Sequence, residues 1–111
     1  MISDQVHEFS RGASFEAILS LPTSIAENYF ALWTPTSQIR QAGKLTVEGL
    51  IGNLTFSWLD GRKFMLVSND TASWPLGAAE LDVLFTEPNT GRKIRTKKLY
   101  IDIQHGVTVT A

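Results

Sequence analysis

The sequence predicts an all-β fold, an antiparallel β-sandwich of about seven to eight short strands. Three observations carry this prediction. Apolar and polar residues alternate with a period of two along most of the chain, which is the period of strands and not of helices. Turn-forming residues interrupt the alternation roughly every 8–12 residues, which is the spacing of sandwiches and barrels. No stretch has the pattern of the long amphipathic helix that a parallel α/β sheet requires.

Composition limits both the architecture and the function. The chain has 111 residues, 43% of them apolar, and a net charge of −1. We therefore expect one β-sandwich domain over residues 1–111, with a single hydrophobic core. The near-neutral charge argues against a nucleic-acid partner, because dedicated nucleic-acid binders are normally basic. The absence of cysteine excludes disulfides, thiolate nucleophiles and cysteine metal sites.

The first half of the chain begins with a strand and a turn-rich connection. Residues 14–19 start as alternation and become fully apolar, as a strand entering a core does. Ser24 and Glu27 match the S-x-x-E capping box, which predicts a short helical turn over 24–28. The chain then becomes extended at Trp33-Thr34-Pro35, because a residue before proline avoids the helical region. Further strands are expected at residues 37–41 and 44–49.

The second half begins with the clearest local signal. Asp60-Gly61 lies between residues 54–59 and 62–67, and this dipeptide predicts a β-hairpin. Ser68 or Asp70 is expected to cap a turn that ends at Trp74-Pro75, where Trp74 closes one end of the sandwich. The remaining expected elements are a strand at 79–86, a loop at 87–91, a strand or strand pair at 93–96 and 99–103, and a β-prone tail at 107–110.

Catalytic and metal sites are not expected. The sequence contains no nucleophile elbow, phosphate-binding loop or paired-histidine zinc motif. His7 and His105 lie near opposite ends of the chain, without a third ligand at close spacing, so we interpret them as surface histidines. Glu80 and Asp82 share one face of a strand, and we interpret them as part of a solvated face. We therefore expect no enzyme activity, no cofactor and no metal.

A basic segment is the sharpest charge feature. Half of the ten basic residues lie within seven positions, as Arg92, Lys93, Arg95, Lys97 and Lys98. Three interpretations remain open. The segment is an edge strand protected by charge against unwanted pairing, a contact surface for an acidic partner protein, or a patch that follows phosphates. The third has the least support, because Tyr100 is the only aromatic residue close to the segment.

The aromatic residues divide into core and contact candidates. Trp58 alternates with Leu54 and Phe56, which predicts a core position. The stretch from Tyr29 to Trp33 is the best candidate for an exposed apolar contact, although insertion into the core is the favoured alternative. The candidate contact residues are therefore Tyr29, Phe30 and Trp33, together with the five basic residues.

The order of several short motifs resembles that of one protein family. The motifs are an aromatic-Arg-Gly segment at 9–15, the triplet Gln38-Ile39-Arg40, the turn at 70–77, the strand at 79–83 and a terminal Val107-Thr108. This order resembles the immunoglobulin-like N-terminal module of phage upper baseplate proteins, and related small tail and fibre-attachment proteins. The segment from Leu21 to Thr36 departs from the family, which has a simple turn there.

The resemblance implies an immunoglobulin-like β-sandwich with a structural function in a phage or prophage virion. The expected partners are other phage structural proteins and further copies of this chain in a homo-oligomer. The expected location is the virion, and the host cytoplasm during assembly. A membrane is not an expected partner, because no apolar stretch approaches the roughly 20 residues that span one. The alternative function is a carbohydrate- or peptide-binding β-sandwich module, with Trp33 and Tyr29 as contact residues.

Overall fold

Eight strands and one 3-10 turn form the part of the chain that the computed structural model describes, residues 6–43 and 47–106. The elements are β1 (Val6–Ser10), β2 (Phe15–Ser20), β3 (Thr34–Gln41), η1 (Val47–Gly49), β4 (Leu50–Trp58), β5 (Lys63–Ser68), β6 (Gly77–Thr86), β7 (Lys93–Arg95) and β8 (Leu99–Gln104). The all-β prediction is confirmed, and so is the hairpin that joins β4 to β5.

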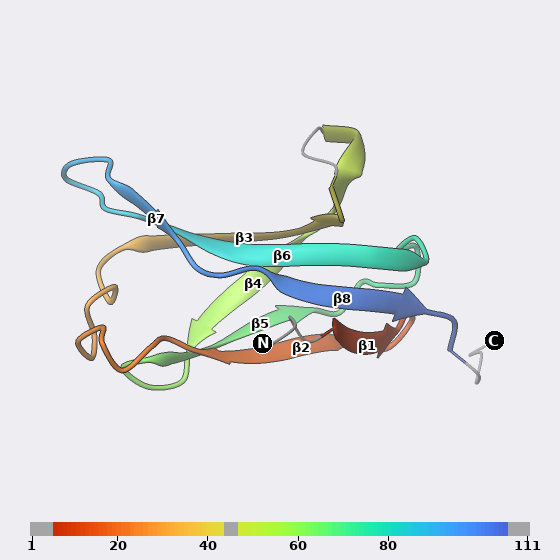
Figure 1. Cartoon of the computed structure of the whole chain (residues 1–111), viewed down its shortest axis with the longest axis horizontal. Helices are drawn as coiled ribbons and strands as arrows, with labels where there is room; N and C mark the ends of the chain where they lie inside the picture. Colours follow the sequence, from red (N-terminus) through yellow and green to blue (C-terminus); the bar gives the residue numbers. More distant parts are fainter. Residues whose placement is uncertain (1–5, 44–46, 107–111) are drawn as a thin grey trace, which may run out of the picture.

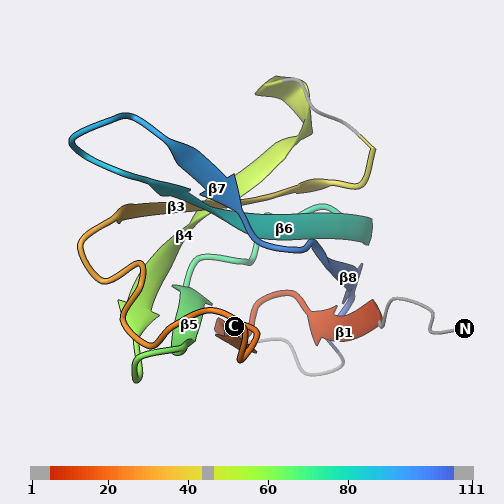
Figure 2. The same ribbon diagram turned by 60° about the vertical axis from the view of Figure 1, so that its left-hand side comes forward.

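The strands follow one continuous path, β1-β8-β6-β3-β4-β5-β2, and β7 pairs with β6 beside it. This mixed sheet curls until it is nearly closed into a barrel-like shape (Figures 1 and 2). Strand β4 makes the path continuous, because residues 50–54 pair with β3 and residues 55–58 pair with β5. The predicted two-layer sandwich is therefore realised only in part, since one strand belongs to both halves and joins them.

The prediction of a wholly antiparallel sheet is wrong at β1, which runs parallel to β8. The turn at residues 11–14 explains how the chain leaves this pair. The backbone nitrogen of Arg11 donates to the Gln104 carbonyl at 2.9 Å. The Thr71 hydroxyl accepts from the backbone nitrogen of Gly12 at 2.8 Å and donates to the Ala13 carbonyl at 2.6 Å. These bonds hold the turn against β8 and the 71–74 turn, and β2 then pairs with β5.

The core lies inside the curled sheet. Strand β6 alternates as predicted, with Ala79, Leu81, Val83 and Phe85 at most 2% exposed. Trp74 is 3% exposed and closes one end of the core against Phe9 and Phe15, as predicted. The opposite end is filled by further aromatic rings, which are Phe30, Trp33, Phe56, Trp58, Phe64 and Phe85.

Two local predictions are wrong. The expected helical turn at 24–28 is a series of separate turns, and Asn28 adopts a φ of 63°, which interrupts a helix. The expected strand at 44–49 does not extend to Val47–Gly49, which form η1. Pairing with β3 begins only at Leu50, so the residues of η1 have no opposite strand in β3. Residues 44–46 and the predicted tail at 107–110 lie outside the described residues.

Strands β7 and β8 lie along the same edge of β6 as two parts of an interrupted strand. Arg95 in β7 is opposite Leu84, and Leu99 in β8 is opposite Leu81. Thr96 fills the interruption, because its backbone nitrogen donates to the Val83 carbonyl and its hydroxyl accepts from the Val83 nitrogen, both at 3.0 Å. The strand pair predicted for 93–96 and 99–103 is therefore confirmed, and the basic segment follows this edge.

Candidate functional site

The basic segment lies on β7 and on the connection from β7 to β8. All three residues of β7 are exposed. Within residues 6–43 and 47–106, β7 pairs with β6 on one side and with no strand on the other. Strand β7 is therefore an edge strand that carries Lys93 and Arg95, in agreement with the first interpretation of the segment.

Three of the five basic side chains have carboxylate partners. The Arg92 Nε lies 4.0 Å from Glu87, an Arg95 nitrogen lies 3.5 Å from Asp82, and the Lys98 Nζ lies 3.5 Å from Glu80. Lys93 and Lys97 form no ion pair with any described residue. The segment thus keeps an excess of positive charge after its internal pairing.

The aromatic cluster is partly inside the core. Phe30 is 2% exposed and stacks on Phe85, with ring centroids 4.4 Å apart and an interplanar angle of 8°. Trp33 is 9% exposed, whereas Tyr29 is 46% exposed. Phe30 is thus not available to a partner in this fold. Leu32 is 88% exposed and was not among the predicted contact residues.

The two predicted contact regions meet at Arg92. The Arg92 guanidinium donates to the Tyr29 hydroxyl at 3.1 Å and lies over the Trp33 ring, 5.2 Å from its centroid. We call Tyr29, Leu32, Trp33 and Arg92 the aromatic–arginine surface. It combines an exposed apolar side chain with two rings and a guanidinium, and Tyr, Trp and Arg are the residue types enriched at energetically important contacts.

Hydrogen bonds to the β4–β5 turn hold the loop that carries Tyr29. The Arg62 Nε donates to the Ile25 carbonyl at 2.8 Å, and the Asn28 nitrogen donates to the Gly61 carbonyl at 2.9 Å. A Cβ at position 61 would lie 3.0 Å from the Cβ of Glu27, so glycine permits this close approach. The aromatic–arginine surface is therefore presented by a braced loop.

The turn that braces this loop has its own electrostatic feature. The Asp60 carboxylate accepts from the backbone nitrogens of Arg62 and Lys63, both at 2.8 Å. These two hydrogen bonds favour the charged form and lower the pKa of Asp60, while the adjacent positive side chains add a smaller effect in the same direction. The turn is therefore most firmly held when Asp60 is ionised.

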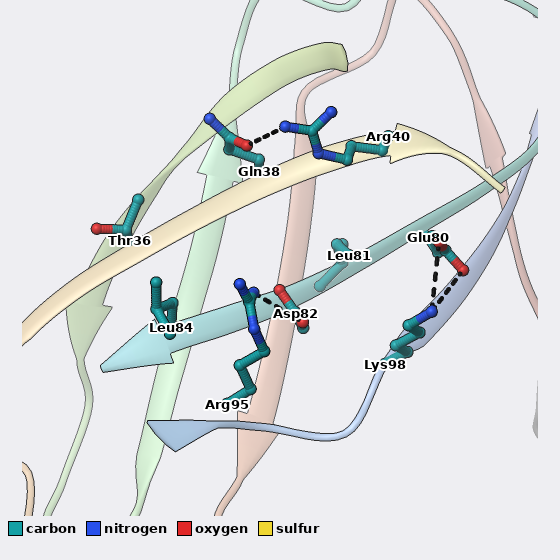
Figure 3. A pocket seen from close by; sticks show the side chains of 9 residues that line it. All are labelled: Thr36, Gln38, Arg40, Glu80, Leu81, Asp82, Leu84, Arg95 and Lys98. Carbon is teal, nitrogen blue, oxygen red and sulfur yellow. Dashed lines mark hydrogen bonds and ion pairs between the residues drawn. The ribbon is translucent and has the colours of Figure 1, made fainter. Parts of the chain in front are cut away.

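A groove of about 520 Å³ lies on the outer face of β3 and β6, beside β7 (Figure 3). Glu80 and Asp82 share the outer face, as predicted, but the interpretation as a solvated face is wrong for Glu80, which is buried at 8% exposure. Each carboxylate is paired with a cation of the basic segment, Glu80 with Lys98 and Asp82 with Arg95. The remaining lining is Thr36, Gln38, Arg40, Leu81 and Leu84. Arg40 also donates to the Gln38 side chain at 3.0 Å, so the charged groups of this groove are paired largely with one another.

The two histidines are in different surroundings. His7 lines a second groove, between β1 and β2, and the His105 Nδ1 lies 3.5 Å from an Arg11 nitrogen. No group of three or more His, Asp or Glu side chains among the described residues could hold a metal ion. The same part of the chain contains no helix long and apolar enough to cross a membrane.

Comparison of the chain with protein-family models, curated proteins and solved structures finds no match. Support for the candidate site therefore comes from its geometry alone. Sequence patterns identified the basic and aromatic segments but not their contact with each other. The predicted stretch 29–33 contains Leu32, but this exposed residue was not singled out. The groove residues Gln38 and Arg40 were missed, and the alternation in β3 was the available signal for them.

Proposed function

We propose that this chain is a structural domain that binds neighbouring proteins through the aromatic–arginine surface and performs no catalysis. The observation that supports this most directly is that Arg92 contacts Tyr29 and Trp33 on the loop that also carries Leu32, which is 88% exposed. A large apolar side chain left in water costs free energy that a partner could recover by covering it. The guanidinium and phenol beside it supply directional polar contacts.

The assembly that we propose is the tail, baseplate or fibre-attachment region of a phage or prophage virion, with passage through the host cytoplasm during assembly. The motif order in the sequence supports this context. The strand pairs β2–β5, β3–β6 and β6–β8 are also those expected for strands B–E, C–F and F–G of an immunoglobulin-like domain. An immunoglobulin-like origin of the barrel is therefore part of the proposal.

A carbohydrate-binding function has less geometric support. Sugar binding by aromatic stacking needs an open ring face, but Trp33 is 9% exposed and Arg92 lies over its ring. Tyr29 alone of the pair offers substantial exposed area. A surface that combines one open ring, one guanidinium and a leucine on the same loop fits a protein partner better than a carbohydrate.

The proposal is tested by binding measurements with purified tail proteins encoded by the genes adjacent to this one. Wild type is expected to bind at least one of them. Leu32→Ser and Arg92→Ala should each weaken that binding about tenfold or more, as expected for central contact residues. Leu76→Ser is the matched control, because Leu76 is also exposed, at 44%, but precedes β6 and lies outside this surface.

Two outcomes would contradict the proposal. One is that no adjacent tail protein binds, or that the adjacent genes encode no tail proteins. The other is that Leu32→Ser and Leu76→Ser bind equally well, because contacts would then not depend on the aromatic–arginine surface. Circular dichroism of each variant separates loss of binding from loss of fold.

A further inference from the structure

Two surfaces of opposite charge each contain charged side chains that have no ion-pair partner among the described residues. The first is the basic edge, defined by Lys93, Ile94, Arg95 and Lys97. The second is the acidic seam, defined by Glu8, Glu16 and Asp102 around the gap between β1 and β2. The two surfaces belong to different edges of the curled sheet, so each is accessible to a separate molecule.

The acidic seam is the place where the barrel fails to close. Strands β1 and β2 are the two ends of the strand path, and no backbone ladder joins them within the described residues. A groove of about 250 Å³ lies there. Its lining contains no lysine or arginine and is apolar except for His7, Glu8 and Glu16. The complete lining is His7, Glu8, Phe9, Phe15, Glu16, Ala17, Ile18, Leu19, Leu99 and Ile101.

The carboxylates of the seam have no cationic partner in the part of the chain that the structure describes. Glu8 is opposite Asp102 in the parallel β1–β8 pair, so two like charges face the same side at close range. Neither of them, nor Glu16, forms an ion pair with any residue the structure describes. Arg11 lies nearby in sequence, but its guanidinium donates to the Trp74 carbonyl and contacts His105. A cation from outside would relieve this repulsion.

Within the described residues, strand β2 pairs with β5 on one side and with no strand on the other. It has six residues, contains neither lysine nor proline, and carries Ile18 at 64% exposure. Such an edge is a template for pairing with another strand. Strand β7 differs, because it has three residues, two of them basic. The charges on β7 disfavour pairing with a second β7, since lysines would face each other.

We propose that β7 of one copy pairs with the free edge of β2 in a second copy, so that the basic edge of each molecule occupies the acidic seam of the next. The side chains alternate in the way that this pairing requires. Lys93 and Arg95 share one face of β7, and Ile94 lies on the other. In β2, Glu16 faces outward, whereas Phe15, Ala17 and Leu19 face the core.

When β7 of one copy is added to β2 of another, Ile94 therefore points toward the apolar side of the seam. Lys93 and Arg95 point toward the carboxylates of the seam. Ile94 is 36% exposed in the single chain, so this contact would cover it. Because the two contacting surfaces differ, the association is head-to-tail, and it continues into a ring or a filament. This inference goes beyond the proposed function, because it names a second copy as the partner and uses different residues.

The test is sedimentation of the purified full chain over a range of concentrations at low and high salt. Wild type is expected to exceed the monomer mass as concentration rises, and to do so less at high salt because exposed charges are screened. Lys93→Gln/Lys97→Gln removes the uncompensated cations, and Glu8→Gln/Glu16→Gln removes carboxylates of the seam. Each double variant should associate about tenfold more weakly or worse. Lys63→Gln/Glu48→Gln, which changes exposed charges elsewhere, should behave as wild type.

A mixture of the two defective variants distinguishes head-to-tail association from other kinds. Each variant retains the surface that the other has lost, so the equimolar mixture should form one-to-one dimers and nothing larger. A strictly monomeric wild type would overturn the inference while leaving binding through Leu32 intact. Unchanged association of either double variant, or a mixture that stays monomeric, would overturn it as well.

Discussion

The guanidinium of Arg92 lies over the ring of Trp33, with 5.2 Å between its central carbon and the ring centroid. The same guanidinium donates to the Tyr29 hydroxyl at 3.1 Å, from a residue 63 positions further along the chain. This contact joins the loop before β3 to the loop between β6 and β7. It therefore links the two segments that the sequence singled out as candidate contact regions.

Replacing Arg92 should loosen this junction. We expect Arg92→Gln to lower the free energy of unfolding by about 1 kcal/mol, because a half-exposed cation–π contact and one hydrogen bond are lost. The Glu87 pair adds little, since its 4.0 Å separation and exposure leave it screened. Arg92→Lys should lose less, because the charge is retained. Urea unfolding checks both, and an unchanged midpoint for Arg92→Gln would show that the contact contributes nothing to stability.

Phe30 and Leu32 form a matched pair within one loop. Phe30 is 2% exposed and stacks on Phe85, so we expect Phe30→Ala to cost about 3–5 kcal/mol through lost burial and a cavity. Leu32 is 88% exposed, so Leu32→Ala should change stability by no more than about 0.5 kcal/mol. Urea or thermal unfolding of both variants checks this. Equal losses would contradict the assignment of one residue to the core and the other to the surface.

The sequence predicted well which side chains of a strand face the core, but it did not predict which distant strands pair with each other. Alternation in β6 identified Ala79, Leu81, Val83 and Phe85 as inward-facing, and Asp60-Gly61 located the β4–β5 hairpin. Both signals are local, and both fix local geometry. The parallel β1–β8 pair has no local signal, because it depends on hydrogen bonds between opposite ends of the chain. The barrel-like closure was missed for the same reason.

The candidate site was also predicted only in part from the sequence. Clustering in the sequence identified the basic segment and the aromatic stretch, since each is contiguous. It gave no indication that Phe30 would stack on Phe85 while Leu32 pointed into solvent, because a chain of tight turns has no regular period. The contact between Arg92 and Trp33 follows only from the folded arrangement of two loops.

The Thr71 hydroxyl should be necessary for the turn between β1 and β2. It is 1% exposed, accepts from the Gly12 nitrogen and donates to the Ala13 carbonyl. Thr71→Val keeps the shape but leaves both backbone groups without this partner, so we expect a loss of about 1–3 kcal/mol. Thr71→Ser retains the hydroxyl and should lose clearly less. If the two variants were equally stable in urea, the hydroxyl would not be the stabilising group.

The pKa of Asp60 predicts how the β4–β5 turn responds to acid. Hydrogen bonds from the backbone nitrogens of Arg62 and Lys63 lower this pKa in the folded state, below the roughly 3.9 of an unperturbed aspartate. The unfolded state therefore takes up a proton first as pH falls, and the stabilisation from ionised Asp60 is lost as pH falls through the folded pKa. At neutral pH that stabilisation is fully present. Asp60→Asn keeps an acceptor oxygen but removes the titration, so the stability difference between wild type and variant should disappear in strong acid. Urea unfolding of both proteins across acidic pH measures this difference, and a difference that stayed constant from neutral to strongly acidic pH would contradict the prediction.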